Sequence, residues 1–304
     1  MVFLSVVLLC PPDRVHDYWA RPDNIRFMKI GLQFPSSTVG RDPFAIRDFA
    51  QAAEGLDYSH LIFNEHIVEA TPTGVPNHDA EHHEMMVLLS YIAGVTSTIG
   101  LLTAVLILPQ RQTVVVAKQA AELDLVSGGR LRLGVGVGNR AEEYQATGAD
   151  YHTRGKRMEE QVKLLRELWT NDWVDFIGDF HETGNISLTI PPVQRPIPVW
   201  MGGSSNPVLE RVGRMADGWL TTSGTKNIAE QASVIKAAAK STGRNPDDVG
   251  IEGRFEIAGL TPDEWRAGVE EWASLGATHL NVRGAGGPAS QIELARQFKE
   301  EVGV

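Results

Sequence analysis

The sequence is poor in three things: cysteine, excess positive charge and long apolar runs. The single cysteine, Cys10, excludes an intrachain disulfide and a multi-cysteine metal site, and it fits a reducing cytoplasm. The 38 acidic residues outnumber the 28 basic ones, so at a net charge of −10 we expect no general affinity for nucleic acid or anionic membranes. No apolar run reaches the ~20 residues that a membrane-spanning helix needs. What remains is ordinary globular composition over 304 residues, a length that suits one large α/β domain.

The first 27 residues differ from the rest of the chain. Residues 1–10 are apolar, like the core of a signal peptide, but no basic residues precede them and no small-residue cleavage site follows. A second start-like stretch at Met28 leads into a strand pattern. We therefore interpret residues 1–27 as an N-terminal extension upstream of a single domain at 28–304, with export as the alternative.

From residue 28 onward, strand patterns alternate with amphipathic helical patterns. We predict eight main strands, at residues 29–34, 60–64, 99–106, 130–137, 198–201, 218–221, 250–257 and 279–283. Helices are predicted at 43–54, 84–96, 113–126, 154–169, 207–214, 228–241, 262–274 and 289–301, with a further helix opening at 142–144. Eight consecutive right-handed strand–helix units close into a parallel barrel, so the predicted fold class is α/β, a (β/α)₈ TIM barrel. A doubly wound open sheet is the alternative.

The alternation breaks after the fourth strand–helix unit. Residues 172–190 mix aromatic residues, glycines and acids with two short strand-like runs, and regular alternation resumes at 198. We predict a hairpin insertion over about residues 172–196.

The stretch 127–139, SGGRLRLGVGVGN, carries a sign of a ligand. Its apolar residues alternate as in a strand, while Gly134, Gly136 and Gly138 leave the strand end without side chains. A bare strand end that leads into a helix suits a flat ligand, or a phosphate held by backbone N–H groups. The run Gly136-x-Gly138-x-x-Ala141 also fits the dinucleotide fingerprint of a Rossmann unit. A third interpretation is that the glycines only let strands approach closely.

A second glycine loop follows the next predicted barrel strand. Residues 202–206, GGSSN, run straight into a helix, where backbone N–H groups and hydroxyls again suit a phosphate. The carboxyl ends of barrel strands share one face. We therefore expect both loops and the Glu65-His66 pair on the same rim.

With these motifs the sequence resembles the luciferase-like flavin monooxygenase superfamily, in the branch dominated by coenzyme F-420-dependent oxidoreductases. The resemblance extends from Met28 to about Gly284. The motifs that carry it together are Glu65-His66 and residues 100–109, 121–138, 143–169 and 197–219. The family fold is a (β/α)₈ barrel with an insertion.

The resemblance implies roles for individual residues. His66 matches a histidine that faces the coenzyme ring, so we expect it to donate or accept a proton beside a hydride transfer, with Glu65 orienting it. The pair Ala104-Val105 matches a non-proline cis peptide that bulges against the ring in some members. Without the resemblance, a structural histidine bonded to a neighbouring carbonyl would be the simpler interpretation of His66.

The resemblance also places the phosphates of the coenzyme tail against the two glycine loops. The implied coenzyme-binding residues, besides Ala104 and Val105, are Gly136, Val137, Gly138, Asn139, Gly202, Gly203 and Ser204. Asn139 is a departure, because the sugar-phosphate dehydrogenases of the family have a glutamate there, which counts against sugar-phosphate oxidation. Tyr151, Arg154 and Arg157 either reach the acidic groups of the tail or are simply solvated.

The predicted function is hydride transfer between a deazaflavin, coenzyme F-420, and a small organic substrate. Two alternatives stay open: an FMN-dependent luciferase-like monooxygenase, and a non-catalytic flavin-binding barrel whose cleft is closed by the loop at 67–82. The resemblance implies a homodimer. Residues 77–84, NHDAEHHE, suit a divalent ion, but no distant ligand is implied, so we expect no metal.

Overall fold

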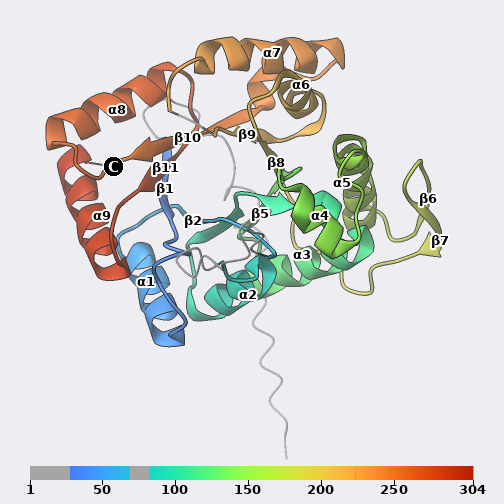
Figure 1. The fold of residues 1–304 in the computed structure, drawn as a ribbon, viewed down its shortest axis with the longest axis horizontal. Coiled ribbons are helices and arrows are strands. Elements are labelled where there is room, and N and C mark those ends of the chain that lie inside the picture. The colour runs from blue at the N-terminus through green and yellow to red at the C-terminus, as the bar shows by residue number, and fades with distance from the viewer. Residues whose placement is uncertain (1–27, 69–81, 223, 304) are drawn as a thin grey trace, which may run out of the picture.

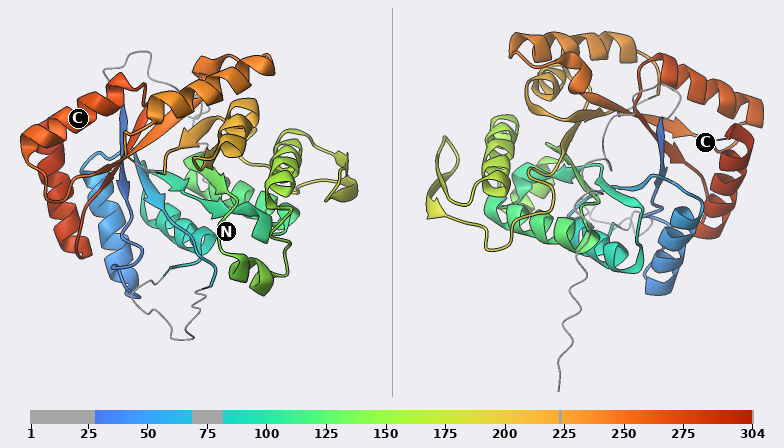
Figure 2. Two further views of the ribbon diagram at one scale, coloured as in Figure 1. Left: turned by 45° about the horizontal axis from the view of Figure 1, so that its top comes forward. Right: turned by 180° about the vertical axis from the view of Figure 1, so that it is seen from behind.

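The computed structural model describes residues 28–68, 82–222 and 224–303. In this part of the chain, parallel strands form a closed barrel that helices surround (Figure 1; two further views in Figure 2). The barrel strands are β1 (Lys29–Gln33), β2 (His60–Phe63), β3 (Gly100–Thr103), β5 (Leu131–Gly136), β8 (Val199–Gly202), β9 (Gly218–Leu220), β10 (Gly250–Glu256) and β11 (His279–Arg283). The predicted TIM barrel is confirmed, and the open sheet and the Rossmann unit are wrong.

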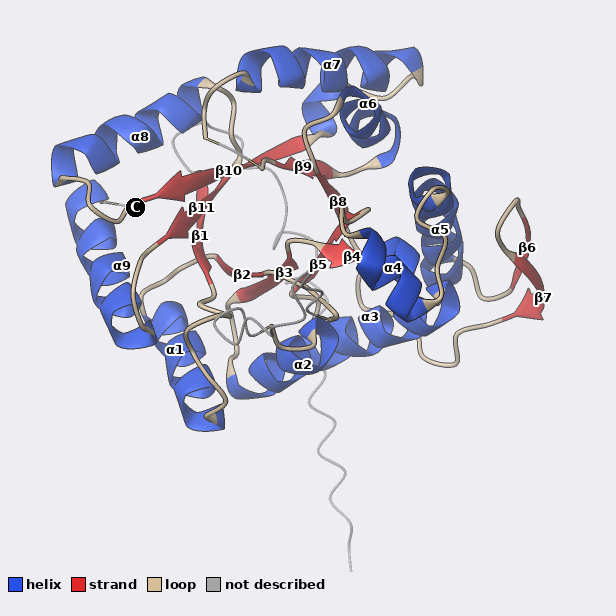
Figure 3. Cartoon of the chain, in the orientation of Figure 1, coloured by secondary structure: helices blue, strands red, loops and turns tan. Residues whose placement is uncertain are grey.

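The ring of strands closes because β1 pairs with β2 on one side and with β11 on the other. Each remaining strand pairs in parallel with the next barrel strand along the chain. Figure 3 shows this ring of strands inside the helices. Closure places all strand carboxyl ends on one face, where TIM barrels carry their sites.

The helices lie close to their predicted bounds. They are α1 (Pro43–Gly55), α2 (Met85–Val95), α3 (Thr113–Ser127), α4 (Ala141–Thr147), α5 (Arg154–Thr170), α6 (Asn206–Met215), α7 (Ile228–Ser241), α8 (Pro262–Ser274) and α9 (Pro288–Val302). Helix α1 illustrates the local causes: Asp42 caps its N-terminus by accepting from the Phe44 N–H, and Pro43 occupies the first position. Its apolar face, with Phe49 and Ala53, is buried against the barrel.

Alternating strand residues separate two apolar regions. Leu131, Leu133 and Val135 of β5 belong to the main core between strands and helices. A smaller group, with Ile62 and Leu102, packs inside the barrel together with Trp200 and Leu220. Residues of β5 that alternate with the first set, such as Arg132 and Gly134, therefore face the barrel interior.

The predicted insertion is a two-stranded antiparallel hairpin, β6 (Val174–Ile177) and β7 (Glu182–Ile186), between α5 and β8. It stands at the edge of the molecule beyond α5 (Figure 1). His181 fastens it, because Nδ1 bonds Glu160 of α5 at 2.7 Å and Nε2 bonds Thr113 of α3 at 2.6 Å. The predicted hairpin is confirmed.

One predicted strand is interrupted. The pattern at 99–106 predicts a single strand, but β3 ends at Thr103 and a two-residue strand, β4 (Leu106–Ile107), follows. Between them lies the bulge that forms part of the site described below. The predicted extension at 1–27 falls outside the described residues. Within the part of the chain that is described, no helix combines the length and the hydropathy of a membrane span.

Candidate functional site

A cavity of about 480 Å³ opens at the carboxyl ends of the barrel strands. It is lined by residues from or next to every strand of the ring. The cavity is also lined by all nine residues that the resemblance implies for the coenzyme: Ala104, Val105, Gly136, Val137, Gly138, Asn139, Gly202, Gly203 and Ser204. The two glycine loops lie side by side because β5 and β8 are paired.

The peptide bond Ala104–Val105 is cis, as the resemblance implies. The chain leaves β3 here, bulges into the cavity and resumes as β4 against β5. The Val105 side chain occupies the space where Cβ atoms at two glycines would lie, at 2.5 Å from the Gly136 position and 2.8 Å from the Gly202 position. These two glycines therefore make room for the bulge, which in turn shapes the cavity.

At Gly138 and Gly203, the backbone conformation is what requires glycine. Their φ angles are +60° and +136°, a region that other L-residues rarely adopt. Gly134 lies deeper, where a Cβ would meet the Thr103 carbonyl oxygen at 1.9 Å. The interpretation that glycines allow close strand packing holds for Gly134, whereas Gly136 makes room for the bulge and the loops present bare backbone to the cavity.

Two buried aromatic side chains contact the loops from outside the cavity. The Tyr144 hydroxyl of α4 donates to the Val137 carbonyl oxygen at 2.6 Å, and the Trp219 Nε1–H of β9 donates to the Gly203 carbonyl oxygen at 2.8 Å. Neither side chain lines the cavity. Burial raises the pKa of Tyr144 well above its ordinary value, so its hydroxyl stays a donor.

His66 follows Asn64, which lines the large cavity, but does not itself line that cavity. Its Nδ1 is 2.9 Å from Oε1 of Glu143, whose side chain is fully buried in α4, while the imidazole itself is a quarter exposed. Its ring packs edge-on against His82, with centroids 5.0 Å apart. His82 lines a smaller cavity of about 230 Å³ that shares Gln33 and Asn64 with the large one. His66 therefore contacts a lining residue of the smaller cavity and lines neither cavity itself.

The expected contact between Glu65 and His66 is wrong. Oε2 of Glu65 accepts from the Ile107 N–H at 2.8 Å, and Oε1 pairs with Arg111. Burial raises the pKa of the Glu65 carboxyl, with Arg111 opposing. Glu65 anchors the chain after the bulge, and Glu143 is the residue that contacts the histidine ring.

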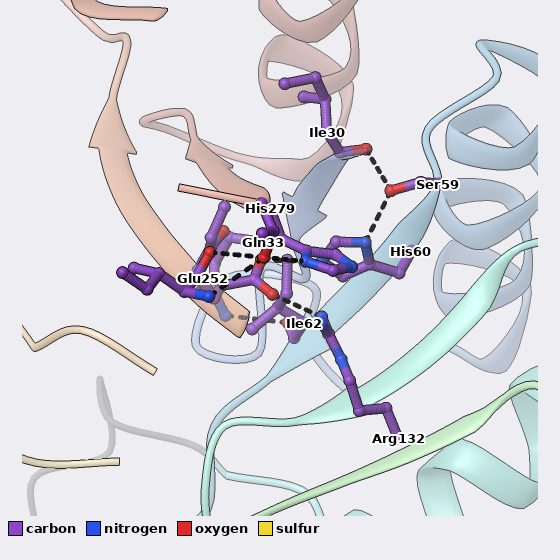
Figure 4. Close-up of polar contacts among 11 residues, drawn as sticks. Ile30, Gln33, Ser59, His60, Ile62, Arg132, Glu252 and His279 are labelled. Carbon is purple, nitrogen blue, oxygen red and sulfur yellow. Dashed lines mark hydrogen bonds and ion pairs between the residues drawn. The ribbon is translucent and has the colours of Figure 1, made fainter. Parts of the chain in front are cut away.

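Sequence reasoning missed a buried ionic cluster below the cavity, made of His60, Arg132 and Glu252 (Figure 4). Glu252 lines the cavity and accepts from His60 Nε2 at 2.8 Å and from Arg132 at 2.5 Å. Burial favours a raised pKa for Glu252, but the contacts with His60 and Arg132 outweigh it and lower the pKa. Burial lowers the pKa of His60, and the Arg132 charge adds to that effect against the pull of Glu252.

Tyr151 and Arg154 lie near the mouth of the cavity. The Tyr151 hydroxyl is 3.4 Å from the Asn139 carbonyl oxygen, and the Arg154 guanidinium lies over the Tyr151 ring at 3.7 Å. Arg157 lies over Phe180 instead, with its guanidinium 5.6 Å from the ring centroid. The suggested metal segment at 77–84 lies mostly outside the described residues, and those that are described include no group of three metal ligands.

Comparison with known proteins fits this geometry. Residues 28–299 match the family described as luciferase-like monooxygenase. The chain belongs to the luciferase-like monooxygenase family. The resemblance read from the motifs is thereby confirmed, and the match begins at the residue predicted to open the domain.

Relatives of this luciferase-like chain include F420-dependent enzymes. An uncharacterised protein of Mycobacterium tuberculosis is 33% identical over 200 residues, which are 66% of this chain and 67% of that protein. The F420-dependent hydroxymycolic acid dehydrogenase of the same organism is 29% identical over 229 residues, 71% of this chain and 61% of that enzyme. Among solved structures, an F420-dependent secondary alcohol dehydrogenase in complex with an F420-acetone adduct superposes with a TM-score of 0.77 at 16% identity, over 90% of this chain and 99% of that one. At that identity the likeness shows the shared barrel.

Proposed function

We propose that this luciferase-like barrel is an oxidoreductase that binds coenzyme F-420 in the large cavity and exchanges a hydride with a small organic substrate. The observation that carries the proposal is the convergence of the bulge, two glycine loops and a histidine at one rim of the barrel. Its relative named as an F420-dependent dehydrogenase supports the choice of coenzyme.

The residues present fit such a coenzyme. Two loops of bare backbone, each followed by a helix, suit the phosphate-bearing tail, and the bulge at Val105 offers a flat apolar wall for a ring. When bound, the deazaflavin would supply the hydride chemistry. The protein would contribute binding, orientation and the movement of a proton.

His66 is the proposed proton donor or acceptor. Its Nδ1 is engaged by Glu143, so Nε2 is the nitrogen left to face a substrate. The smaller cavity lined by His82 adjoins the large one next to this histidine. We place the substrate there, between His66 and the coenzyme. Asn139, in place of the glutamate of sugar-phosphate dehydrogenases, counts against a sugar phosphate.

The proposal is tested by titrating the purified protein with coenzyme F-420 and with FMN while following absorbance and fluorescence. We expect F-420 to bind at micromolar concentration or below and FMN to bind more weakly. Tight FMN binding without F-420 binding would reverse the order in favour of the FMN-dependent monooxygenase, which the family description also allows. Coenzyme binding without reduction by any of a panel of alcohols would favour the non-catalytic barrel.

We also propose that the protein is a homodimer. Large apolar side chains are exposed on the adjacent helices α2 and α3 and just before the hairpin, among them Val87 (68% exposed), Val126 (61%) and Trp173 (66%). A second copy of the chain is the partner proposed to cover them. Sedimentation equilibrium should give about twice the chain mass of 33.3 kDa, and Val126→Glu should shift the equilibrium toward monomer.

A further inference from the structure

Each of the two glycine loops accepts a hydrogen bond at a backbone carbonyl from an aromatic side chain that does not line the cavity. On the first loop Tyr144 holds the carbonyl of Val137, and on the second Trp219 holds the carbonyl of Gly203. The two aromatic residues come from different elements, α4 and β9, and both are buried, at 1% and 0% exposure. Each contacts the peptide group between two residues that line the cavity, Val137–Gly138 in one loop and Gly203–Ser204 in the other.

Each of these hydrogen bonds to a carbonyl also fixes the direction of the N–H in the same peptide group. In a planar trans peptide the carbonyl and the N–H of the next residue point in opposite directions. With the Val137 carbonyl directed at Tyr144, which does not line the cavity, the Gly138 N–H points away from Tyr144. With the Gly203 carbonyl directed at Trp219, which also does not line the cavity, the Ser204 N–H points away from Trp219 in the same way.

Both N–H groups are free to serve a ligand. Within the described part of the chain, neither the Gly138 nor the Ser204 N–H donates to a backbone or side-chain acceptor. Both residues line the cavity, on loops that follow the paired strands β5 and β8. Two backbone donors without a partner, on loops that follow neighbouring strands, suit an anion with several acceptor oxygens, such as a phosphate.

We propose that Tyr144 and Trp219 are positioning residues that aim the Gly138 and Ser204 N–H groups at one phosphate group in the cavity. This inference rests on the proposed function, because the phosphate would be that of the coenzyme tail. It adds residues that touch neither coenzyme nor substrate and act through the backbone.

The experiment compares ligands that differ in their phosphate. Dissociation constants are measured for F-420 against its phosphate-free chromophore, 8-hydroxy-5-deazariboflavin, and for FMN against riboflavin. The proteins are the wild type, Tyr144→Phe and Trp219→Phe. We expect each variant to bind the phosphate-bearing ligands about tenfold more weakly, the scale of one lost hydrogen bond to a charged group, and to bind the phosphate-free ligands within twofold of the wild type.

The chain offers matched controls for both substitutions. The Tyr58 hydroxyl donates to the Ala295 carbonyl at 2.9 Å, and Trp265 Nε1–H donates to the Ile257 carbonyl at 2.9 Å, both buried and away from the cavity. Tyr58→Phe and Trp265→Phe should leave the preference for phosphate-bearing ligands as it is in the wild type. If Trp219→Phe does not fold, Tyr144→Phe carries the test alone.

The outcomes separate this inference from the proposed function. Equal loss of affinity for both members of a ligand pair, or no loss for either, overturns the positioning role while coenzyme binding stands. If the wild type binds no coenzyme of either kind, the proposed function fails. Thermal stabilisation by inorganic phosphate then decides the inference: it should be present in the wild type and reduced in Tyr144→Phe, and equal stabilisation of the two would overturn it.

Discussion

His66 and Glu143 are 77 residues apart in the sequence and 2.9 Å apart in the structure. The motif that resembles the family points to His66, but nothing local marks Glu143 beyond its place in the first turn of a helix. The contact arises because β5 and α4 bring Glu143 to the rim where β2 ends. Adjacency in the sequence points to Glu65 instead, but the carboxylate of Glu65 accepts from the Ile107 N–H.

Replacing His66 tests the proposed proton transfer directly. We expect His66→Ala to lower the turnover number with F-420 by roughly 10²- to 10⁴-fold, the usual contribution of general acid–base catalysis. Coenzyme affinity should change less than threefold, because His66 lies outside the large cavity. His152→Ala, at an exposed site, is the control for stopped-flow and titration measurements. Normal turnover in His66→Ala would remove the hypothesis.

Glu143→Gln tests whether the buried carboxylate orients the histidine. The amide keeps the volume but weakens the bond to Nδ1, so we expect kcat to fall about tenfold while the dissociation constant for F-420 stays the same. The exposed neighbour Glu142→Gln should have no effect on either quantity. A Glu143→Gln enzyme with unchanged kcat and an unchanged pH–rate profile would leave Glu143 a purely structural residue.

At the scale of the element, strand and helix bounds follow closely from the sequence, because hydrophobic period, caps and turn residues act locally. The bulge between β3 and β4 does not, since alternation continues through Thr103 and Leu106 on both sides of it. Only the resemblance located the cis bond at Ala104–Val105. The local pattern also does not explain why glycine is required at Gly136 and Gly202. The atoms that exclude a Cβ there belong to Val105, about 30 residues before Gly136.

Gly136→Ala should displace the bulge. The new Cβ would lie 2.5 Å from Cγ2 of Val105, so the valine or the strand must move. We expect a loss of about 1–3 kcal/mol in the free energy of unfolding, typical of overpacking, and a more than tenfold weaker affinity for F-420. The measurements are urea denaturation and coenzyme titration.

A second substitution and a control complete this test. Val105→Ala added to Gly136→Ala should recover part of the lost stability, because it removes the clashing methyl groups. Gly94→Ala, at an open position in helix α2, should raise stability by about 0.5–1 kcal/mol. If Gly136→Ala behaves like Gly94→Ala, the packing argument is wrong.

At the scale of the whole molecule, the His60, Arg132 and Glu252 cluster joins three strands across the barrel interior. No motif announces it, because its members are 72 and 120 residues apart and each alone reads as an isolated polar residue in a strand. Barrel closure alone brings them together. The sequence predicts the closed barrel, but it does not predict which inward-facing side chains contact one another.

The cluster predicts that the fold loses stability in mild acid. The folded pKa of His60 lies below its ordinary 6.5, so below pH 6.5 the unfolded chain takes up a proton that the folded protein resists. Stability therefore falls as pH drops from 6.5 toward the folded pKa, and Glu252, whose pKa is also lowered, adds a further loss below its ordinary 4.5.

Chemical denaturation at pH 7.5 and pH 5.5 measures this effect. One proton changes the free energy of unfolding by at most ~1.4 kcal/mol per pH unit. Between pH 7.5 and pH 5.5, we therefore expect the free energy of unfolding of His60→Gln to fall by about 1 kcal/mol less than that of the wild type. The exposed His152→Gln should follow the wild type. Identical pH dependence in His60→Gln and the wild type would mean that this histidine is not the responsible group.

Because β1 pairs with β11 and α9 runs back antiparallel to the strands, Lys29 and Val302 both lie at the amino-terminal face of the barrel, opposite the cavity. The order in which the chain visits the ring is therefore not essential to the ring. A circular permutant that links Val302 to Lys29 and takes its new ends in the hairpin turn at 178–181 should fold into the same barrel and bind F-420 within threefold of the original. Cooperative unfolding and coenzyme titration of the permutant would measure whether the fold and the cavity depend on the position of the chain termini.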